Sequence, residues 1–164
     1  MSQPFHVEVL TKDHDRTGFA FGIAPLDKYF REQVSQDVRR RIATCFVAVE
    51  TASGAIAGYY TLAAASVPLP GLPDAVARKL PRYPLVPVAR LGRLAVATRF
   101  IGRKLGAALL ADAGLRASRS ELGVYALVVD AKDEDAQSFY LHHGFMPLNT
   151  ASRQLMMPLA RLSK

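Results

Sequence analysis

The sequence predicts an α+β fold in which a single mixed β-sheet is flanked by helices on both faces. Along the 164 residues, short apolar or alternating runs typical of strands are interspersed with longer segments whose apolar residues lie three or four apart, which is typical of helices. Residues 124–129 are apolar without alternation, which indicates a strand covered on both faces. No stretch has the composition of a polar linker, so we expect one domain over residues 1–164.

An edge strand and a helix are expected first. Residues 6–10 alternate weakly between polar and apolar, as a strand with one exposed face does. Pro25 suits the first turn of a helix, and apolar residues then recur every fourth position up to Val38. The helix runs into Arg39, Arg40 and Arg41, which either complement its negative C-terminal end or form part of a surface that faces RNA.

A hairpin and a proline-rich segment follow. Residues 45–50 and 56–64 are apolar strands, and Thr51-Ala-Ser-Gly54 between them is a hairpin signal. Residues 67–87 hold six of the ten prolines. Because leucines and a tyrosine are interleaved with these prolines, we expect an ordered, partly helical insertion on the surface rather than a domain boundary.

The central stretch is a strand, a glycine-containing turn and a helix. Residues 88–96 are β-branched and apolar, Gly102 and Gly106 bracket a basic turn, and helical spacing continues to about Ser118. A helix start offers free N–H groups and a positive dipole end to an anion. Further positive charge of the kind a pyrophosphate needs comes from Arg99, Arg103 and Lys104. The segment by itself also fits a tight turn with a solvated basic face, and it matches neither the Walker pattern nor G-x-G-x-x-G.

The C-terminal part predicts the strand at 124–129, a short helix from Asp133 to about His142, and closing strands at 145–148 and 154–159. Acidic residues in the first turn of the short helix suit its dipole.

The composition indicates the cellular compartment of the protein and the kind of partner it binds. The net charge of +7 favours a phosphate-bearing partner such as nucleic acid or a nucleotide cofactor. A positive net charge can also serve solubility alone. The single cysteine, Cys45, excludes an internal disulfide, fits a reducing compartment and lies in an apolar run that predicts a buried thiol. The chain shows no signal peptide and no apolar run of membrane-spanning length, so we expect a cytoplasmic protein without a membrane partner.

Two motifs resemble the GNAT superfamily of acyl-CoA-dependent N-acetyltransferases. That family has a Gln/Arg-x-x-Gly-x-Gly/Ala turn that cradles the coenzyme A pyrophosphate. Here the turn is Ile101-Gly-Arg-Lys-Leu-Gly106, with Ile101 in place of Gln/Arg and Lys104 in place of the middle glycine. The family's second motif is Asn-x-x-Ala-x-x-x-Tyr followed by Gly-Phe. It is matched, with aspartate for asparagine, by Asp133, Ala136, Tyr140, Gly144 and Phe145.

The match is closer to the GNAT toxins of toxin–antitoxin pairs. Similar to that branch are Phe21–Asp27 with Tyr29-Phe30, Ala57–Ala63, Leu91–Val96, the proline-rich insertion and the closing Leu155-Met-Met-Pro-Leu159. The resemblance implies a GNAT fold, acetyl-CoA as donor, the amino group of aminoacyl-tRNA as acceptor, and a block of translation. It also implies neutralisation by a ribbon-helix-helix antitoxin and a homodimer.

The resemblance further implies the site residues. Tyr140 is expected to protonate the departing thiolate, because a phenol with a pKa of about 10 keeps its proton at neutral pH; the alternative is a tyrosine that only packs in the core. A backbone N–H of Ala95 or Val96 would polarise the thioester carbonyl. The expected coenzyme contacts are Leu94, Ala95, Val96, Gly102, Arg103, Lys104, Leu105, Gly106, Ala107, Asp133 and Ser138. The expected tRNA contacts are Arg39, Arg40, Arg41, Arg90, Arg93 and Arg99, with Arg116 and Arg119 as further candidates. No metal ligand is assigned.

No general base stands out near Tyr140. The acidic or basic residues close to it in sequence are Glu134, Asp135, His142 and His143, and for the histidines a role in capping or solvating the helix end is favoured over that of a base. An α-amino group with a pKa of about 7.7–8.0 is partly neutral without a base, whereas a lysine amine at about 10.4 is not, and this favours aminoacyl-tRNA as acceptor. Two alternatives stay open: a GNAT enzyme acting on a small amine or a protein N-terminus, and a non-catalytic basic module that binds nucleic acid or a regulator.

Overall fold

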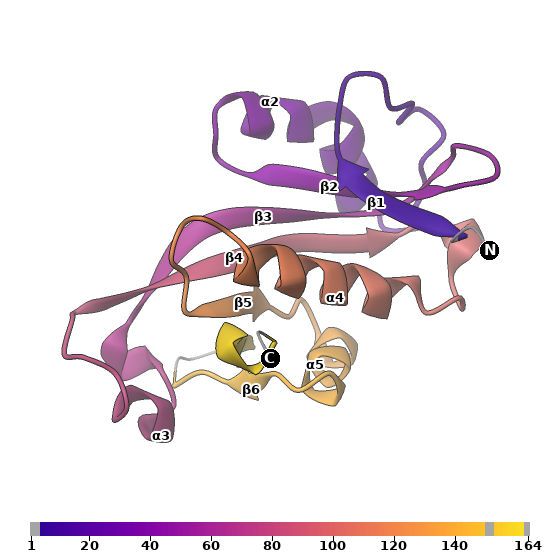
Figure 1. The fold of residues 1–164 in the computed structure, drawn as a ribbon. Helices are drawn as coiled ribbons and strands as arrows, with labels where there is room; N and C mark the ends of the chain where they lie inside the picture. Colours follow the sequence, from indigo (N-terminus) through magenta and orange to yellow (C-terminus); the bar gives the residue numbers. More distant parts are fainter. Residues whose placement is uncertain (1–3, 150–152, 163–164) are drawn as a thin grey trace. The chain divides into compact units, whose positions relative to one another are not determined.

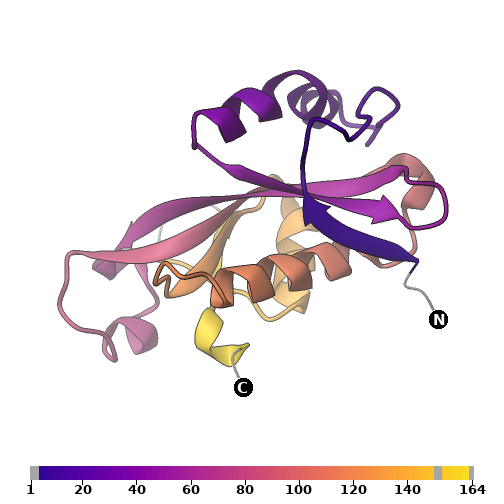
Figure 2. The same cartoon turned by 45° about the horizontal axis from the view of Figure 1, so that its top comes forward.

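The computed structural model describes residues 4–149 and 153–162 (Figures 1 and 2). The strands are β1 (Phe5–Val9), β2 (Thr44–Glu50), β3 (Ile56–Pro68), β4 (Leu85–Val96), β5 (Ala126–Asp130), β6 (Met146–Pro147) and β7 (Gln154–Pro158). The α-helices are α1 (Ala24–Lys28), α2 (Val34–Arg39), α3 (Asp74–Ala77), α4 (Leu105–Ser118) and α5 (Glu134–His142). A π-helical segment, Tyr29–Gln33, joins α1 to α2, and 3₁₀ turns occupy Leu69–Gly71, Thr98–Phe100 and Leu159–Arg161.

The seven strands form one mixed sheet in the order β1-β2-β3-β4-β5-β7-β6, which confirms the predicted sheet. β1 with β2, β2 with β3, β5 with β7 and β6 with β7 are antiparallel, whereas β4 and β5 are parallel from Val88 opposite Ala126 to Leu91 opposite Val129. In the described parts of the chain, no helix is long and apolar enough to cross a membrane.

The chain groups into two compact units. The first holds the residues up to Ala63 together with Gly92–Ala113, and the second holds Ala64–Leu91 together with the residues from Gly114 onward. The strands β3 and β4 and the helix α4 pass from one unit to the other. The single domain expected from composition stays a prediction.

In the first unit, the predicted N-terminal helix contains a π turn. The N–H of Val34 bonds to the carbonyl of Tyr29, five residues earlier. The two consecutive side chains at the start of this turn, Tyr29 and Phe30, are both buried, at 4% and 0% exposure. The apolar pattern predicted the helix but not this irregularity.

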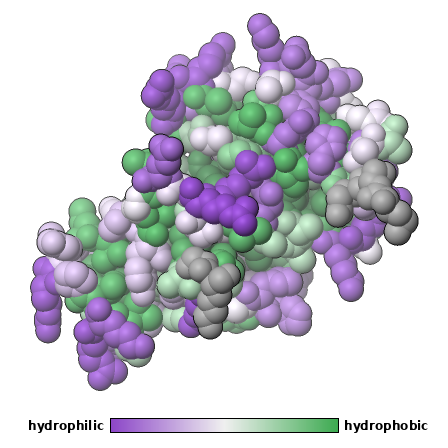
Figure 3. All heavy atoms as spheres, viewed as in Figure 1, coloured by the Kyte–Doolittle hydropathy of each residue, from purple (hydrophilic) through white to green (hydrophobic). Residues whose placement is uncertain are grey.

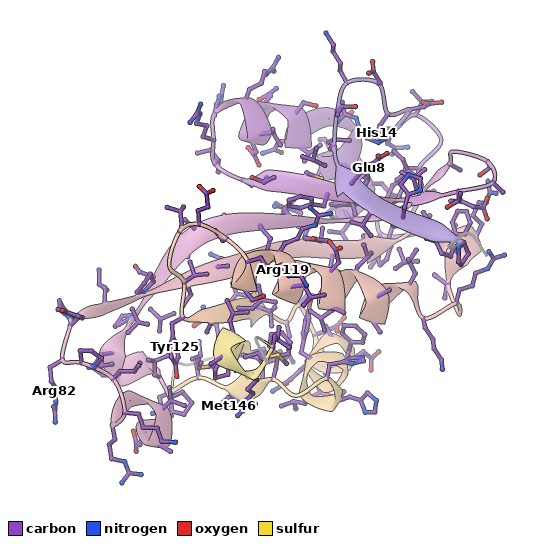
Figure 4. The ribbon with its side chains drawn as sticks, in the orientation of Figure 1. Glu8, His14, Arg82, Arg119, Tyr125 and Met146 are labelled. Atoms are coloured by element: carbon purple, nitrogen blue, oxygen red, sulfur yellow. The ribbon has the colours of Figure 1, made fainter. Side chains whose placement is uncertain are left out.

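The loop before that helix is held by a hydrogen bond between residues of the Phe21–Asp27 motif. Gly22 has a φ of +91°, which favours glycine, and the buried Asp27 accepts a hydrogen bond of 2.6 Å from the N–H of Phe21 through Oδ1. Further upstream, His14 Nε2 lies 2.8 Å from Glu8 Oε1 and fastens the loop after β1 to that strand (Figure 4). The Phe21–Asp27 motif therefore has a structural role.

The core of the first unit depends on close approach of β3 to β4. A Cβ on Gly58 would lie 2.7 Å from the carbonyl oxygen of Ala95 and 3.0 Å from Leu109 Cδ1, so only glycine fits. The stacked rings of Phe30 and Tyr59, 4.4 Å apart, belong to the same core. Cys45 is buried as predicted, at 1% exposure, and burial raises the pKa of its thiol to about 12.

The second unit has a core of its own, made of buried side chains from the insertion and from β3 to β7. Its members are Val67, Leu72, Val86, Val88, Ala126, Val128, Leu148 and Met156. Two partly buried residues pack against this core: Tyr125, directly before β5, and Met146, in β6 (Figure 4). The insertion is ordered and partly helical, as predicted. Asn149 fixes it, because its N–H donates to Gly71 O at 2.7 Å and its Nδ2 donates to Leu72 O at 3.0 Å.

Candidate functional site

The turn before α4 has the backbone of an anion-binding loop. Gly102 has a φ of +91°, and Lys104 is also left-handed, with a φ of +60°. Lys104 occupies the position of the family's middle glycine, and its left-handed backbone is one that glycine adopts most easily. The first α-helical hydrogen bond runs from Ala108 N–H to Lys104 C=O, so the N–H groups of residues 105–107 have no partner within the helix. These groups, with the exposed Arg103 and Lys104, can hold a pyrophosphate.

The end of β4 lies in the same unit. Ala95 is fully buried, whereas Leu94 and Val96 are partly exposed. The N–H of Arg93 donates to the side chain of Thr61, at 3.1 Å from Oγ1. A Cβ on Gly92 would lie 2.7 Å from that oxygen, so the glycine admits the threonine. This side-chain contact lies just before the predicted pantetheine segment.

The predicted RNA-facing arginines differ in their local surroundings. Arg39, Arg40 and Arg41 are exposed at the end of α2, where hydrophilic residues gather at the top of Figure 3. Arg93 is exposed, and its guanidinium carbon lies 3.6 Å from the centroid of the Tyr29 ring.

The other two arginines of that set have acidic partners. Arg90, in the second unit, pairs with Asp130. Arg99, in the first unit, lies beside Glu50 together with Arg103. Glu50 was not singled out from the sequence, because the contact joins residues that no local pattern relates.

Tyr140 is placed by the C-terminal cap of α5 in the second unit. Phe145 N–H donates to Tyr140 C=O at 3.1 Å, and Gly144 N–H donates to Leu141 C=O at 3.1 Å. With Gly144 at a φ of +93°, this is a Schellman motif. The hydrophobic contact that accompanies the motif is the Tyr140–Phe145 ring pair, 5.4 Å apart. The Gly-Phe that follows the tyrosine in the family's pattern therefore fixes the main chain of the tyrosine.

The hydroxyl of Tyr140 carries no hydrogen bond to any residue within 4–149 and 153–162, although only 9% of the residue is exposed. Buried tyrosine hydroxyls usually have a partner. Three other buried tyrosines do: Tyr29 donates to Asp37, Tyr59 to Leu26 C=O and Tyr60 to Asp112. Burial raises the pKa of Tyr140 to about 12, so its phenol keeps the proton and can donate it.

The remaining predicted residues of α5 have defined positions. Asp133 is the N-cap, and its Oδ1 accepts a hydrogen bond of 2.8 Å from Ala136 N–H, so this oxygen is already used. Ser138 is exposed on the helix. His143 stacks edge-on against Phe139, with centroids 4.7 Å apart, at the helix end. This position agrees with the capping alternative for the histidines.

A pocket of about 440 Å³ in the first unit was not predicted. Its lining comes from the loop before α1, the β2–β3 turn and the residues after β4, and includes Asp15, Phe19, Ser53, Thr98 and Arg99. These segments are far apart in sequence, so no motif indicated the pocket.

Comparison with known proteins agrees with this geometry. Residues 41–147 match the acetyltransferase (GNAT) domain family. Over 151 residues the chain is 35% identical to the tRNA-acetylating toxin of Mycobacterium tuberculosis (strain ATCC 25618 / H37Rv), covering 90% of this chain and 89% of the relative.

Two solved structures share the fold. AtaT complexed with acetyl-methionyl-tRNAfMet is 27% identical, with a TM-score of 0.90 and 96% of each chain covered. A tyrosine-to-phenylalanine mutant of the AtaT toxin, bound to the C-terminus of the antitoxin AtaR and acetyl-CoA, is 25% identical, with a TM-score of 0.81, and 98% of this chain and 96% of that chain are covered. By sequence and by fold, this chain belongs to the GNAT acetyltransferase family.

Proposed function

We propose that this protein is the toxin of a toxin–antitoxin pair, which transfers an acetyl group from acetyl-CoA to the amino group of an aminoacyl-tRNA and so blocks translation. The observation that carries the proposal is Tyr140, a largely buried residue whose phenol keeps its proton and whose hydroxyl has no hydrogen bond to the described residues. The similarity to a tRNA-acetylating toxin and to AtaT complexed with acetyl-methionyl-tRNAfMet supports the choice of acceptor.

In this proposal, Tyr140 is the general acid. Bound acetyl-CoA would supply the acetyl group as a thioester. As the neutral amine forms the new C–N bond and the C–S bond breaks, Tyr140 gives its proton to the departing sulfur, and it regains one from the nitrogen through solvent. The raised pKa keeps this proton available across neutral pH.

The other residues bind and orient. The N–H groups at the start of α4, with Gly102, Arg103 and Lys104, hold the pyrophosphate, and Leu94, Ala95 and Val96 provide main-chain donors for the pantetheine arm and the thioester carbonyl. Ser138 is kept as a coenzyme contact, whereas Asp133 contributes chiefly through the cap of α5. The exposed arginines at 39–41 and at 93 contact tRNA phosphates.

The proposed partner is a ribbon-helix-helix antitoxin, and the proposed assembly is a cytoplasmic homodimer. The AtaT mutant bound to the C-terminus of the antitoxin AtaR supports the kind of partner. A gene for a small ribbon-helix-helix protein next to this one, relief of growth arrest on its co-expression, and a dimer mass by light scattering are the expected results.

Tyr140→Phe tests the proposal, with Tyr125→Phe as the matched control in the same unit. With labelled acetyl-CoA and charged tRNA, Tyr140→Phe is expected to lower kcat by about 10²–10⁴-fold, the usual contribution of a positioned acid, without loss of coenzyme binding. Tyr125→Phe should leave kcat unchanged. An undiminished Tyr140→Phe enzyme contradicts the acid role.

The choice of acceptor is tested separately with a panel of polyamines and peptides beside the charged tRNA. Labelled small amines or peptides with unlabelled tRNA would exclude the toxin proposal and favour the small-amine or N-terminal acetyltransferase. The absence of acetyl-CoA binding by calorimetry would instead favour the non-catalytic basic module.

A further inference from the structure

Arg99 and Arg103 share one carboxylate in the first unit. Arg99 Nη2 lies 3.9 Å from Glu50 Oε1, and Arg103 Nη1 lies 3.6 Å from Glu50 Oε2. Both separations exceed a hydrogen bond, so these contacts do not use the directed N–H donors of the two guanidinium groups. The group as a whole has two positive charges and one negative charge, which leaves it able to accept an anion.

The carboxylate is fixed, whereas the arginine side chains are exposed. Ser53 Oγ donates a hydrogen bond of 2.6 Å to Glu50 Oε1, and the Glu50 side chain is 20% exposed. The side chains of Arg99 and Arg103 are 67% and 56% exposed. The guanidinium groups can therefore turn from Glu50 to a ligand without disturbing the turn that carries Glu50.

An aromatic ring lies against the guanidinium groups of both arginines. The guanidinium carbon of Arg99 lies 4.7 Å from the centroid of the Phe100 ring, and that of Arg103 lies 5.5 Å from it. Phe100 is 2% exposed and meets Phe5 edge-on at 5.6 Å, so the ring is held in the core. Two guanidinium groups over one rigid ring form a pre-organised pair.

We propose that Arg99 and Arg103 clamp the 3′-phosphate of coenzyme A, and that Glu50 holds the two guanidinium groups until that phosphate displaces it. This inference rests on the proposed use of acetyl-CoA, and it moves Arg99 from the tRNA contacts to the coenzyme contacts. A phosphate monoester has a second pKa of about 6 and is therefore mostly a dianion at neutral pH. Two guanidinium groups match a dianion with several free oxygens better than the singly charged diester of an RNA backbone. Arg103 also belongs to the turn proposed to hold the pyrophosphate of the same molecule.

The test compares binding of acetyl-CoA and acetyl-dephospho-CoA, which lacks the 3′-phosphate, to the full chain by calorimetry. The wild type is expected to bind acetyl-CoA about 10-fold or more tightly, the effect of a hydrogen bond between charged groups. Arg99→Ala should remove most of this difference by weakening acetyl-CoA binding alone. Arg31→Ala, which removes an exposed arginine of the π-helical segment, should leave the difference intact.

Glu50→Gln distinguishes electrostatics from misfolding, because its effect has the opposite sign. The amide can still accept from Ser53, but the competing negative charge is gone, so acetyl-CoA should bind about 2- to 5-fold more tightly, as expected for one partly exposed charge pair. Weaker binding of acetyl-CoA by Glu50→Gln overturns the displacement that we propose.

Three further results overturn the inference. The wild type could bind the two ligands equally, or Arg99→Ala could weaken both equally. Arg99→Ala could also raise KM for charged tRNA while acetyl-CoA binding stays unchanged, which would assign the pair to RNA. Failure of the wild type to bind either ligand is a different result, because it refutes the proposed function itself.

Discussion

The left-handed backbone of Lys104 is tested by replacing it with glycine and, in parallel, with alanine. At a φ of +60°, a side chain brings Cβ close to the carbonyl oxygen that follows, at a cost of about 1–2 kcal/mol. Lys104→Gly removes this strain, whereas Lys104→Ala keeps it. Both changes remove the ammonium group, so their difference isolates the backbone.

The difference can be estimated from two opposing terms. Glycine relieves the strain in the folded protein but gains more conformational freedom in the unfolded chain, which costs about 0.5–1 kcal/mol relative to alanine. Lys104→Gly should therefore be more stable than Lys104→Ala by about 0.5–1 kcal/mol, or about 1–4 °C in Tm for a chain of this length.

Thermal unfolding followed by circular dichroism measures this difference, and calorimetry with acetyl-CoA follows the function. An equal loss of acetyl-CoA affinity in the two variants would measure the lost charge, and any difference between them would measure the backbone. If Lys104→Ala melts at or above the temperature of Lys104→Gly, the residue is not left-handed and the reasoning is refuted.

Three further predictions concern other parts of the chain. Gly144→Ala should lower the free energy of unfolding by about 1–2 kcal/mol, because Gly144 has a φ of +93° and a Cβ there would lie 3.3 Å from Met157 Cε. It should also reduce kcat, because the helix cap that fixes Tyr140 is lost. Unchanged melting and kcat would contradict this prediction. With a hydrolysis-resistant amide-linked aminoacyl-tRNA, the rate should rise with pH as the amine loses its proton at about 7.7–8.0. Because burial raises the pKa of Tyr140 to about 12, its proton should be retained at pH 10, and a fall in rate centred there would show an unburied phenol. Gly58→Ala should cost about 1–3 kcal/mol, since its Cβ would lie 2.7 Å from Ala95 O, while Gly123→Ala, with nothing within 4 Å, should melt like the wild type.

Elements with a strong local signal were predicted well from the sequence. The helix expected to end near Ser118 ends there, and the strand at 88–96 is present with three further residues at its start. Leucines among the prolines of the insertion correctly predicted packing, because Leu72 is fully buried. These features depend on the pattern of apolar side chains within one segment, and that pattern can be read directly from the sequence.

Features that depend on partners distant in sequence were not predictable. The π turn at Tyr29–Gln33 interrupts a regular apolar spacing that by itself predicts a continuous α-helix. The meeting of Glu50 with Arg99 and Arg103 depends on how the β2–β3 hairpin lies against the turn after β4. For Tyr140, the motif predicted the residue, but only its surroundings in the fold show that its hydroxyl has no hydrogen bond to the residues that the structure describes.

The way in which α5 ends has a consequence for the genetics of such a protein. The position of Tyr140 depends on main-chain bonds from Gly144 and Phe145 and on ring contacts, while its oxygen bonds to none of the described residues. Tyrosine codons become phenylalanine codons by one nucleotide change, and that change would spare folding. Cells that lose the antitoxin would therefore select alleles that still produce abundant, folded and harmless protein.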